Sequence, residues 1–326
     1  MRGEFELIAR YFAPLAARAP EAGGLRDDAA LFDPAVGASL VVTVDALVEG
    51  VHFLPEDPPE LIGRKLLRVN LSDLAAMGAR PRGYLLATAF PRRIEEAWIE
   101  GFAAGLAADQ DAFHVSLYGG DTVSTPGPLA LFLTAFGEVA RGRALARSSA
   151  RAGDLVYVSG TLGDGALGLE VLRGGLADLP AAEREALAMR YRLPRPRLSL
   201  GEALVETGLG TAAIDVSDGL VADLGHVAET SGLAAEIEAA AVPLSPAARR
   251  ALAADPGLRP AVLAGGDDYE LLFTAAPERA AEVAELARSL DLPLTRIGVM
   301  REGRGVRALD EAGREVRLPG AGWRHF

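Results

Sequence analysis

The sequence contains no cysteine among its 326 residues. This absence excludes disulfides, iron–sulfur clusters, thiolate zinc sites and cysteine nucleophiles. Histidine is also scarce, because the chain has four, His52, His114, His226 and His325, and no two have the spacing of a helical zinc motif. We therefore expect neither redox chemistry at sulfur nor a zinc site.

Lysine is almost absent as well. Lys65 is the only lysine, and it lies in Gly-Arg-Lys-Leu. A P-loop needs a lysine between glycine and serine or threonine, and a protein-kinase fold needs one on a strand, so Lys65 fits neither pattern. If this protein uses ATP, metal ions and arginines must neutralise the phosphates.

The chain also lacks long apolar runs and long basic runs. No stretch of 18 or more apolar residues exists, so no membrane span is expected, and the N-terminus has no apolar secretory core. The net charge is −12, with 45 acidic and 33 basic residues, which argues against a nucleic-acid partner. We expect a cytoplasmic protein.

The length suits two domains rather than one core. A polar, arginine-rich stretch at 140–153 separates two segments that both mix strand and helix patterns. We therefore predict domains at 1–140 and 150–326. In the first segment, strands are expected at 39–45, 84–90, 115–118 and 129–139, and helices at 4–12, 60–77 and 94–109. In the second, strands are expected near 154–159, 212–216, 234–238, 270–275 and 294–300, and helices near 164–173, 182–191, 197–207, 218–231 and 277–290. The fold class expected is α+β, with a strand-rich N-terminal domain and an α/β C-terminal domain.

Aspartates stand at predicted strand ends or in glycine-bearing turns, at Asp28, Asp45, Asp121, Asp215, Asp218 and Asp267. Asp73 differs because it lies within the predicted helix 60–77, on an otherwise mostly apolar face. Each acid taken singly has a structural explanation, such as a turn or a helix cap. Taken together at these positions, they make a metal site and separate structural roles about equally well supported. Magnesium is the metal that suits them, because it binds through one or two carboxylates together with substrate phosphates.

Residues 163–168 match the G-x-G-x-x-G pattern of dinucleotide-binding proteins. That pattern also requires a second strand ending in an acid about 20 residues later, and residues 174–186 do not provide one. A tight strand-to-helix turn is the better interpretation, and NAD binding is a weak alternative.

Eight ordered motifs resemble the thiamine-monophosphate kinase family, within the aminoimidazole-ribonucleotide-synthetase-like ATP-binding group. They are DDAALF (27–32), TVDALVEGVHF (43–53), VNLSDLAAMGA (69–79), YGGDT (118–122), GRALARS (142–148), AIDVSDGL (213–220), GGDDYELLF (265–273) and GWRHF (322–326). The resemblance implies a two-domain synthetase-like fold that dimerises through its N-terminal domains. The C-terminal domain completes an active-site cleft.

The resemblance also implies site residues. Several Mg²⁺ ions are expected on Asp28, Thr43, Asp45, Asp73, Asp121, Asp215 and Asp218. ATP, as co-substrate, is expected to contact Gly120, Asp121, Arg147 and Ser217, and thiamine monophosphate to contact His52, Asp267 and Trp323. The implied reaction is direct phosphoryl transfer from ATP to thiamine monophosphate, with no covalent nucleophile. Asp267 stands where the family commonly has a glutamate.

Two alternatives stay open. Another ATP-using enzyme of the group, such as one like aminoimidazole ribonucleotide synthetase, would share the metal-binding aspartates but differ at 50–53 and 322–326. A nucleotide- and metal-binding regulator would bind ATP without turnover. Both are distinguished from the implied kinase by measuring product formation.

Overall fold

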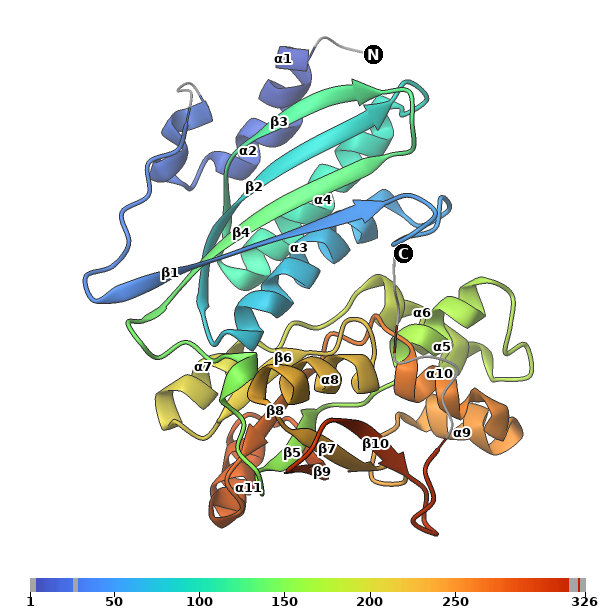
Figure 1. Ribbon diagram of the computed structural model, residues 1–326. Coiled ribbons are helices and arrows are strands. Elements are labelled where there is room, and N and C mark those ends of the chain that lie inside the picture. The colour runs from blue at the N-terminus through green and yellow to red at the C-terminus, as the bar shows by residue number, and fades with distance from the viewer. Residues whose placement is uncertain (1–3, 26–28, 317–321, 323–326) are drawn as a thin grey trace. The chain divides into compact units, whose positions relative to one another are not determined.

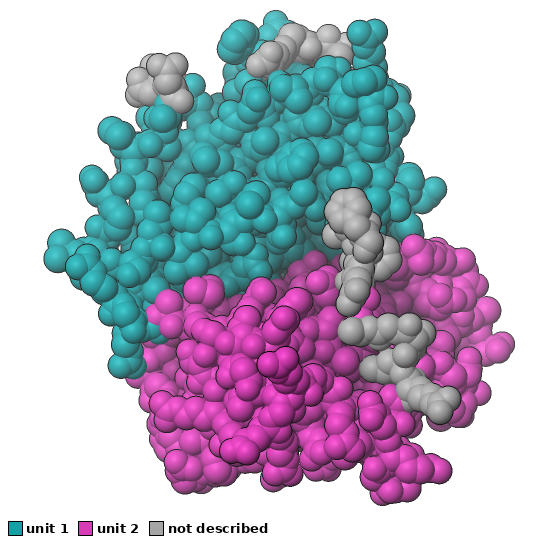
Figure 2. All heavy atoms as spheres, in the orientation of Figure 1, with its two compact units in different colours: residues 1–74, 79–143 teal, residues 75–78, 144–326 magenta. Residues whose placement is uncertain are grey.

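The computed structural model describes residues 4–25, 29–316 and 322. The chain divides into two compact units, shown in Figure 2. Unit 1 comprises residues 1–74 and 79–143, and unit 2 comprises residues 75–78 and 144–326. Each unit is described by itself below.

Unit 1 is built on a four-stranded sheet with helices on one face (Figure 1). The sheet has the order β1-β4-β2-β3, made from β1 (Ala38–Val48), β4 (Ala130–Ala140), β2 (Arg80–Pro91) and β3 (Ser116–Thr125). β4 pairs antiparallel with both neighbours, whereas β2 and β3 are parallel. Helices α3 (Pro59–Ala76) and α4 (Glu96–Phe113) cover one face. Alternation along β4 buries Leu131 and Leu133 and leaves Phe132 41% exposed on the other face.

The N-terminal segment is broken rather than continuous. A helix was predicted there, and the structure has α1 (Glu4–Leu7), the π-helix η1 (Ile8–Phe12) and α2 (Ala13–Ala16), followed by the 3₁₀ segment η2 (Pro20–Leu25). Phe12 and Leu15 are buried, so the segment is held by packing of its apolar side chains.

Unit 2 contains a six-stranded sheet in the order β10-β7-β9-β5-β8-β6. Its strands are β5 (Leu155–Ser159), β6 (Ala212–Asp215), β7 (Ala234–Glu238), β8 (Leu271–Ala275), β9 (Leu294–Arg301) and β10 (Gly305–Leu309). Every residue of β5, β6 and β8 is buried. These strands are mostly apolar because both faces of the sheet are covered; the polar residues in them are Ser159, Asp215 and Thr274.

The sheet of unit 2 separates two hydrophobic cores. Val156, Val158 and Leu272 face one core, whereas Tyr157 and Phe273 face the other. The helices of the unit are α5 (Asp164–Leu172), α6 (Ala181–Arg192), α7 (Leu198–Thr207), α8 (Leu220–Ser231), α9 (Pro246–Ala254), α10 (Arg259–Ala264) and α11 (Ala280–Ser289), with short 3₁₀ turns at η3 (Arg147–Ser149), η4 (Pro256–Leu258) and η5 (Pro277–Arg279).

The expected α+β class is confirmed: the described residues form two mixed units with one sheet each. Three elements were not predicted, namely α9, α10 and β10. The two helices are short, and each has a proline in its first turn. β10 is a short, glycine- and arginine-containing strand that is held by parallel pairing with β7. None of them carries a strong local pattern, so their existence depends on tertiary packing.

Candidate functional site

The first cluster lies between β1 and α3. Thr43 and Asp45 occupy alternate positions of β1, opposite Ala135 and Leu133 of β4, whose side chains are buried beneath the helices. Thr43 and Asp45 therefore face α3. The Thr43 hydroxyl donates a 2.5 Å hydrogen bond to Oδ2 of Asp73 on that helix. The structure thus joins Thr43 and Asp73, which are 30 residues apart in sequence.

Asn70 completes this cluster and was not predicted as a site residue. It is fully buried, its Nδ2 donates to the Leu66 carbonyl at 2.9 Å, and its Oδ1 accepts from the Asp45 backbone N–H at 3.1 Å. The Asp45 N–H of the edge strand β1 is therefore satisfied by the Asn70 side chain of α3. Asn70 lies one helical turn before Asp73, and this i, i+3 spacing is the sequence signal that would have found it.

Asp45 was expected at a strand end and Asp121 in a glycine-bearing turn after a strand, and both expectations are wrong, because both residues lie inside strands. β1 continues to Val48 and β3 continues to Thr125. The sheet order places β1 and β3 at opposite edges, three strand spacings or about 14 Å apart. Asp121 is opposite Ala87, on the face of the sheet that α3 and α4 do not cover. Within one copy of unit 1, Asp121 and the Thr43–Asp73 cluster are therefore apart.

Position 120 requires a glycine because the backbones of β3 and β2 lie very close together there. A Cβ at this position would lie 1.9 Å from the Leu86 carbonyl oxygen on the neighbouring strand. The β2–β3 register shifts just before it, between Tyr84 and Leu85. Any side chain at position 120 would push the two strands apart, so the glycine positions the Asp121 backbone.

His52 lies in a turn that follows β1. Its Nδ1 accepts a 3.0 Å hydrogen bond from the Val48 N–H. A neutral His52 therefore carries its proton on Nε2, which makes Nε2 a donor. Lys65 is 2% exposed, and its Nζ donates to the His52 carbonyl at 3.0 Å. The only lysine of the chain thus helps to hold this turn.

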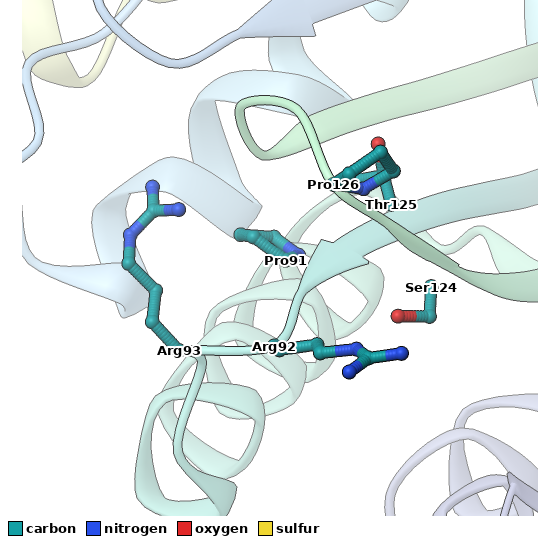
Figure 3. Close-up of a pocket in the computed structure, with 6 residues that line it drawn as sticks. All are labelled: Pro91, Arg92, Arg93, Ser124, Thr125 and Pro126. Atoms are coloured by element: carbon teal, nitrogen blue, oxygen red, sulfur yellow. The ribbon is translucent and has the colours of Figure 1, made fainter.

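A cavity of about 640 Å³ lies at the ends of β2 and β3, lined by Arg92, Arg93, Ser124 and Thr125 with two prolines (Figure 3). The two guanidinium groups point in different directions. Arg93 forms an ion pair with Glu49, which also accepts from the Leu129 N–H. The cavity therefore does not present two converging positive charges to an anion.

In unit 2, a buried aspartate organises the loop that follows β6. Ser217, Asp218 and Gly219 each donate their backbone N–H to Oδ2 of Asp223, at 3.1, 3.1 and 3.0 Å. The sequence suggested that Asp218 caps the following helix, but Asp223 binds these N–H groups instead. Burial, and then the charge of Asp218, raise the pKa of Asp223 to about 7, although the three donors oppose the shift.

A second segment is joined to this loop. Asp267 donates its N–H to the Ser217 carbonyl at 2.9 Å, and Tyr269 donates to the Val216 carbonyl at 2.8 Å. Gly266 packs against the same loop, because a Cβ there would lie 2.2 Å from the Ser217 oxygen. Asp267 itself has φ of +70°, which L-residues rarely adopt. The structure thus brings the Ser217 and Asp267 segments together, directly after Asp215 ends β6.

Arg147 begins η3 beside this region of unit 2. Its carbonyl accepts from the Ser231 hydroxyl at 3.1 Å, and the preceding carbonyl of Ala146 accepts from Ala213 of β6 at 3.3 Å. These contacts anchor the backbone and leave the Arg147 side chain exposed. An exposed guanidinium next to β6 is available for an anionic ligand.

Two predicted site residues, Asp28 and Trp323, lie outside the described residues. Within the described part of the chain, no group of three or more carboxylates or histidines is close enough to hold a metal ion by itself. The described part of the chain also contains no helix that is both long and apolar enough to cross a membrane.

The glycines of the 163–168 pattern are explained by packing. Gly163 has φ of +84°, and Cβ atoms at 165 and 168 would lie 2.4 and 2.1 Å from the carbonyl oxygens of Asp267 and Leu187. β5, which precedes them, pairs antiparallel with both neighbours. A dinucleotide-binding unit requires parallel strands at this point, so the tight-turn interpretation is supported.

Known proteins resemble this chain over nearly its whole length. Residues 26–139 match the family described as AIR synthase related protein, N-terminal domain, and residues 151–311 match the corresponding C-terminal domain. The thiamine-monophosphate kinase of Caulobacter vibrioides is 42% identical over 325 residues, covering 99% of this chain and 90% of that protein.

Solved structures of thiamine-monophosphate kinases are also similar to this chain. Thiamine-monophosphate kinase from Stenotrophomonas maltophilia K279a has a TM-score of 0.85 at 46% identity, covering 96% of this chain and 98% of that chain. AaThiL complexed with AMPPCP and TMP has a TM-score of 0.79 at 33% identity, covering 100% of this chain and 99% of that chain. The chain belongs to the thiamine-monophosphate kinase family, within the AIR synthase related proteins.

Proposed function

We propose that this protein transfers the γ-phosphoryl group of ATP to the phosphate of thiamine monophosphate, giving thiamine diphosphate and ADP. The observation that carries the proposal is the 33% identity, over the whole chain, to a protein solved with AMPPCP and TMP. A phosphate oxygen of the acceptor forms a bond to the γ-phosphorus as the bond to the ADP oxygen breaks. The acceptor is already ionised near neutral pH, so no covalent nucleophile or dedicated base is needed.

Both substrates are anionic, and the chain has a single lysine that is almost fully buried. Mg²⁺ would neutralise the phosphates and orient them. Its expected ligands are Thr43, Asp45 and Asp73 in unit 1, Asp215 and Asp218 in unit 2, together with Asp28 and Asp121. The Thr43–Asp73 hydrogen bond and the capping of the 217–219 loop by Asp223 support this, because both hold expected ligands in place.

ATP is expected to contact Gly120, Asp121, Arg147 and Ser217. Gly120 lets β3 lie close to Leu86 of β2 and so fixes the backbone that carries Asp121, and the exposed Arg147 would supply positive charge. Thiamine monophosphate is expected to contact His52, Asp267 and Trp323. His52 is suited to its part because Nε2 carries the proton and can donate to a phosphate oxygen.

We also propose that the protein is a homodimer formed through unit 1. The uncovered face of its sheet exposes apolar side chains, including Val42 at 52%, Val44 at 62% and Phe132 at 41%. An apolar face of this kind is typical of a protein interface. Asp121 also lies on this uncovered face, at the edge away from β1, whereas the Thr43–Asp73 cluster lies on the face covered by α3. We place the reaction in the cytoplasm, where ATP is maintained.

The test is to incubate purified protein with ATP, Mg²⁺ and thiamine monophosphate and to separate the thiamine phosphates by chromatography. We expect diphosphate to form in step with ADP and to cease when EDTA is added. ATP binding without diphosphate would contradict the proposal and would favour a regulator or a different ATP-using enzyme.

A further inference from the structure

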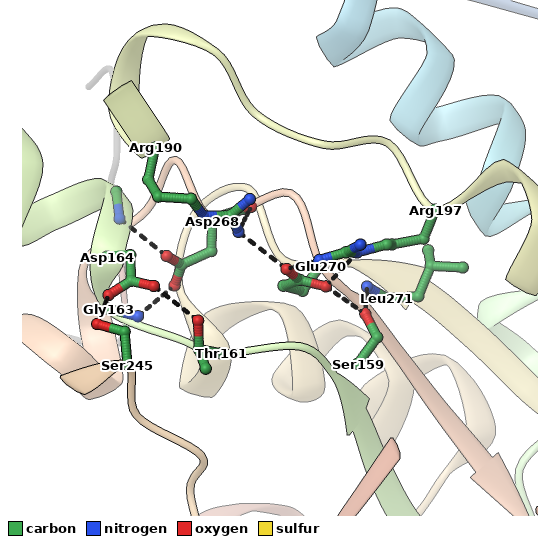
Figure 4. A network of polar contacts seen from close by, with 11 residues as sticks. Ser159, Thr161, Gly163, Asp164, Arg190, Arg197, Ser245, Asp268, Glu270 and Leu271 are labelled. Carbon is green, nitrogen blue, oxygen red and sulfur yellow. Dashed lines mark hydrogen bonds and ion pairs between the residues drawn. The ribbon is translucent and has the colours of Figure 1, made fainter. Parts of the chain in front are cut away.

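One buried carboxylate in unit 2 binds two arginines beside the expected substrate segment. Glu270 is 0% exposed, and Figure 4 shows it with Arg190, Arg197 and Ser159. Arg197 contacts it through Nε at 2.6 Å and Nη2 at 2.5 Å, and Arg190 through Nη2 at 2.8 Å. Ser159, at the end of β5, donates its hydroxyl to Oε2 at 2.5 Å. The Glu270 side chain therefore ties β5, the end of α6 and the start of α7 to one point.

Glu270 lies at the end of the segment that carries Asp267. Residues 265–270 form no regular strand, and Asp267 and Tyr269 both have positive φ, +70° and +51°. Such conformations cost free energy and persist only where the surroundings impose them. Backbone hydrogen bonds to Val216 and Ser217 hold one side of this segment.

The side chains of Asp268 and Glu270 hold the other side of this segment. Asp268 accepts from the Gly163 N–H at 2.6 Å and the Gly165 N–H at 3.0 Å, and Glu270 binds the two arginines. Arg190 also donates to the Asp268 carbonyl at 3.3 Å, so it contacts the segment backbone directly. Asp268 and Glu270 thus anchor the stretch that bears Asp267.

Stability alone does not account for this arrangement. Burying one carboxylate with two guanidinium groups costs desolvation energy that the ion pairs only partly offset, and apolar residues of similar volume would commonly be as stable. Charged, bidentate hydrogen bonds also fix the relative orientation of the groups that they join. The segment so defined carries the residue expected to contact thiamine monophosphate.

We propose that Glu270, with Arg190 and Arg197, is a positioning unit that holds residues 265–269 against Val216–Ser217 and thereby sets the place of Asp267 for thiamine monophosphate. This inference rests on the proposed function. It predicts that loss of the Glu270 charge weakens use of thiamine monophosphate more than use of ATP, because Glu270 acts through Asp267.

The experiment compares wild type, Glu270→Gln, Asp267→Ala and the double variant, all as full-length protein, by steady-state kinetics with each substrate varied. We expect Glu270→Gln to raise KM for thiamine monophosphate about tenfold or more and KM for ATP less than about threefold. In the double variant, we expect KM for thiamine monophosphate to match that of Asp267→Ala alone. Such non-additivity is the mark of residues that act through one another.

The matched control is Asp109→Asn in unit 1. Asp109 is also 0% exposed and bound by two arginines, Arg64 at 3.0 Å and Arg68 at 2.5 Å. It does not touch the substrate segment, so its loss should lower the melting temperature without raising KM for thiamine monophosphate. If Glu270→Gln does not fold, Arg190→Met is used, because it removes one of the two arginines and leaves Glu270 bound by Arg197 and Ser159.

The outcomes separate the two proposals. No diphosphate from the wild type overturns the proposed function itself. Active wild type with an unchanged KM for thiamine monophosphate in Glu270→Gln or Arg190→Met overturns the positioning role. Equal rises in both KM values, or fully additive effects with Asp267→Ala, also overturn it, because they indicate a general structural loss.

Discussion

The stability of this protein should depend on the protonation of Asp268. The side chain is 2% exposed, and burial raises its pKa to about 8 from 3.8, with the charge of Asp164 adding to the rise. The N–H groups of Gly163 and Gly165 and the charge of Arg190 oppose the shift. The folded protein therefore holds a proton on Asp268 over a pH range in which the unfolded chain has released it.

The sign and size of the effect follow from this difference. A group whose pKa is raised by folding stabilises the fold fully below its unfolded pKa, and the contribution disappears as pH rises through the folded value. One pKa unit corresponds to about 1.4 kcal/mol, so raising the pH by two units, from about 5 to about 7, should remove about 2.5 kcal/mol of this contribution.

The assay is urea unfolding at several pH values for wild type and Asp268→Asn. The asparagine does not titrate, and every other ionisable group is common to both proteins. The free energy of unfolding of wild type minus that of the variant should therefore fall steadily from about pH 5 to about pH 8 and level off above it. A difference that stays constant across this range would mean that the two N–H donors keep Asp268 ionised, and would refute the reasoning.

Three further changes test the expected site. Asp45→Asn should lower kcat at least about a hundredfold with little change in melting temperature, because a metal ligand loses its charge; near-normal turnover would contradict the metal role. Lys65→Met should raise KM for thiamine monophosphate about tenfold, since the His52 carbonyl loses its charged donor; unchanged KM would show that the turn holds without Lys65. Trp323→Ala should raise KM for thiamine monophosphate more than KM for ATP, and equal effects would indicate a structural role.

Only part of the expected site could be predicted from local sequence patterns. Thr43 and Asp73 were expected together from a family resemblance, and the structure joins them because β1 alternates and α3 packs on one face of the sheet. Asn70, Asp223 and Glu270 were not predicted as site residues. The arginines that bind Glu270 are 80 and 73 residues away, and nothing in the neighbouring sequence indicates them. Asp223 binds N–H groups only four to six residues before it, and the only local signal for Asn70 is its spacing to Asp73.

Composition by itself determined which chemistry is absent: a chain without cysteine and with one lysine cannot use thiolates or a P-loop lysine. Periodicity determined the main helices and strands, because burial on one face leaves a repeating apolar pattern. Only the tertiary structure decided the face and edge on which each aspartate lies. Asp45 ends one predicted strand and Asp121 closely follows another, and only the strand order shows that they lie at opposite edges of one sheet. Strand order is a long-range property, set by how whole strands pair and pack, and no short motif records it.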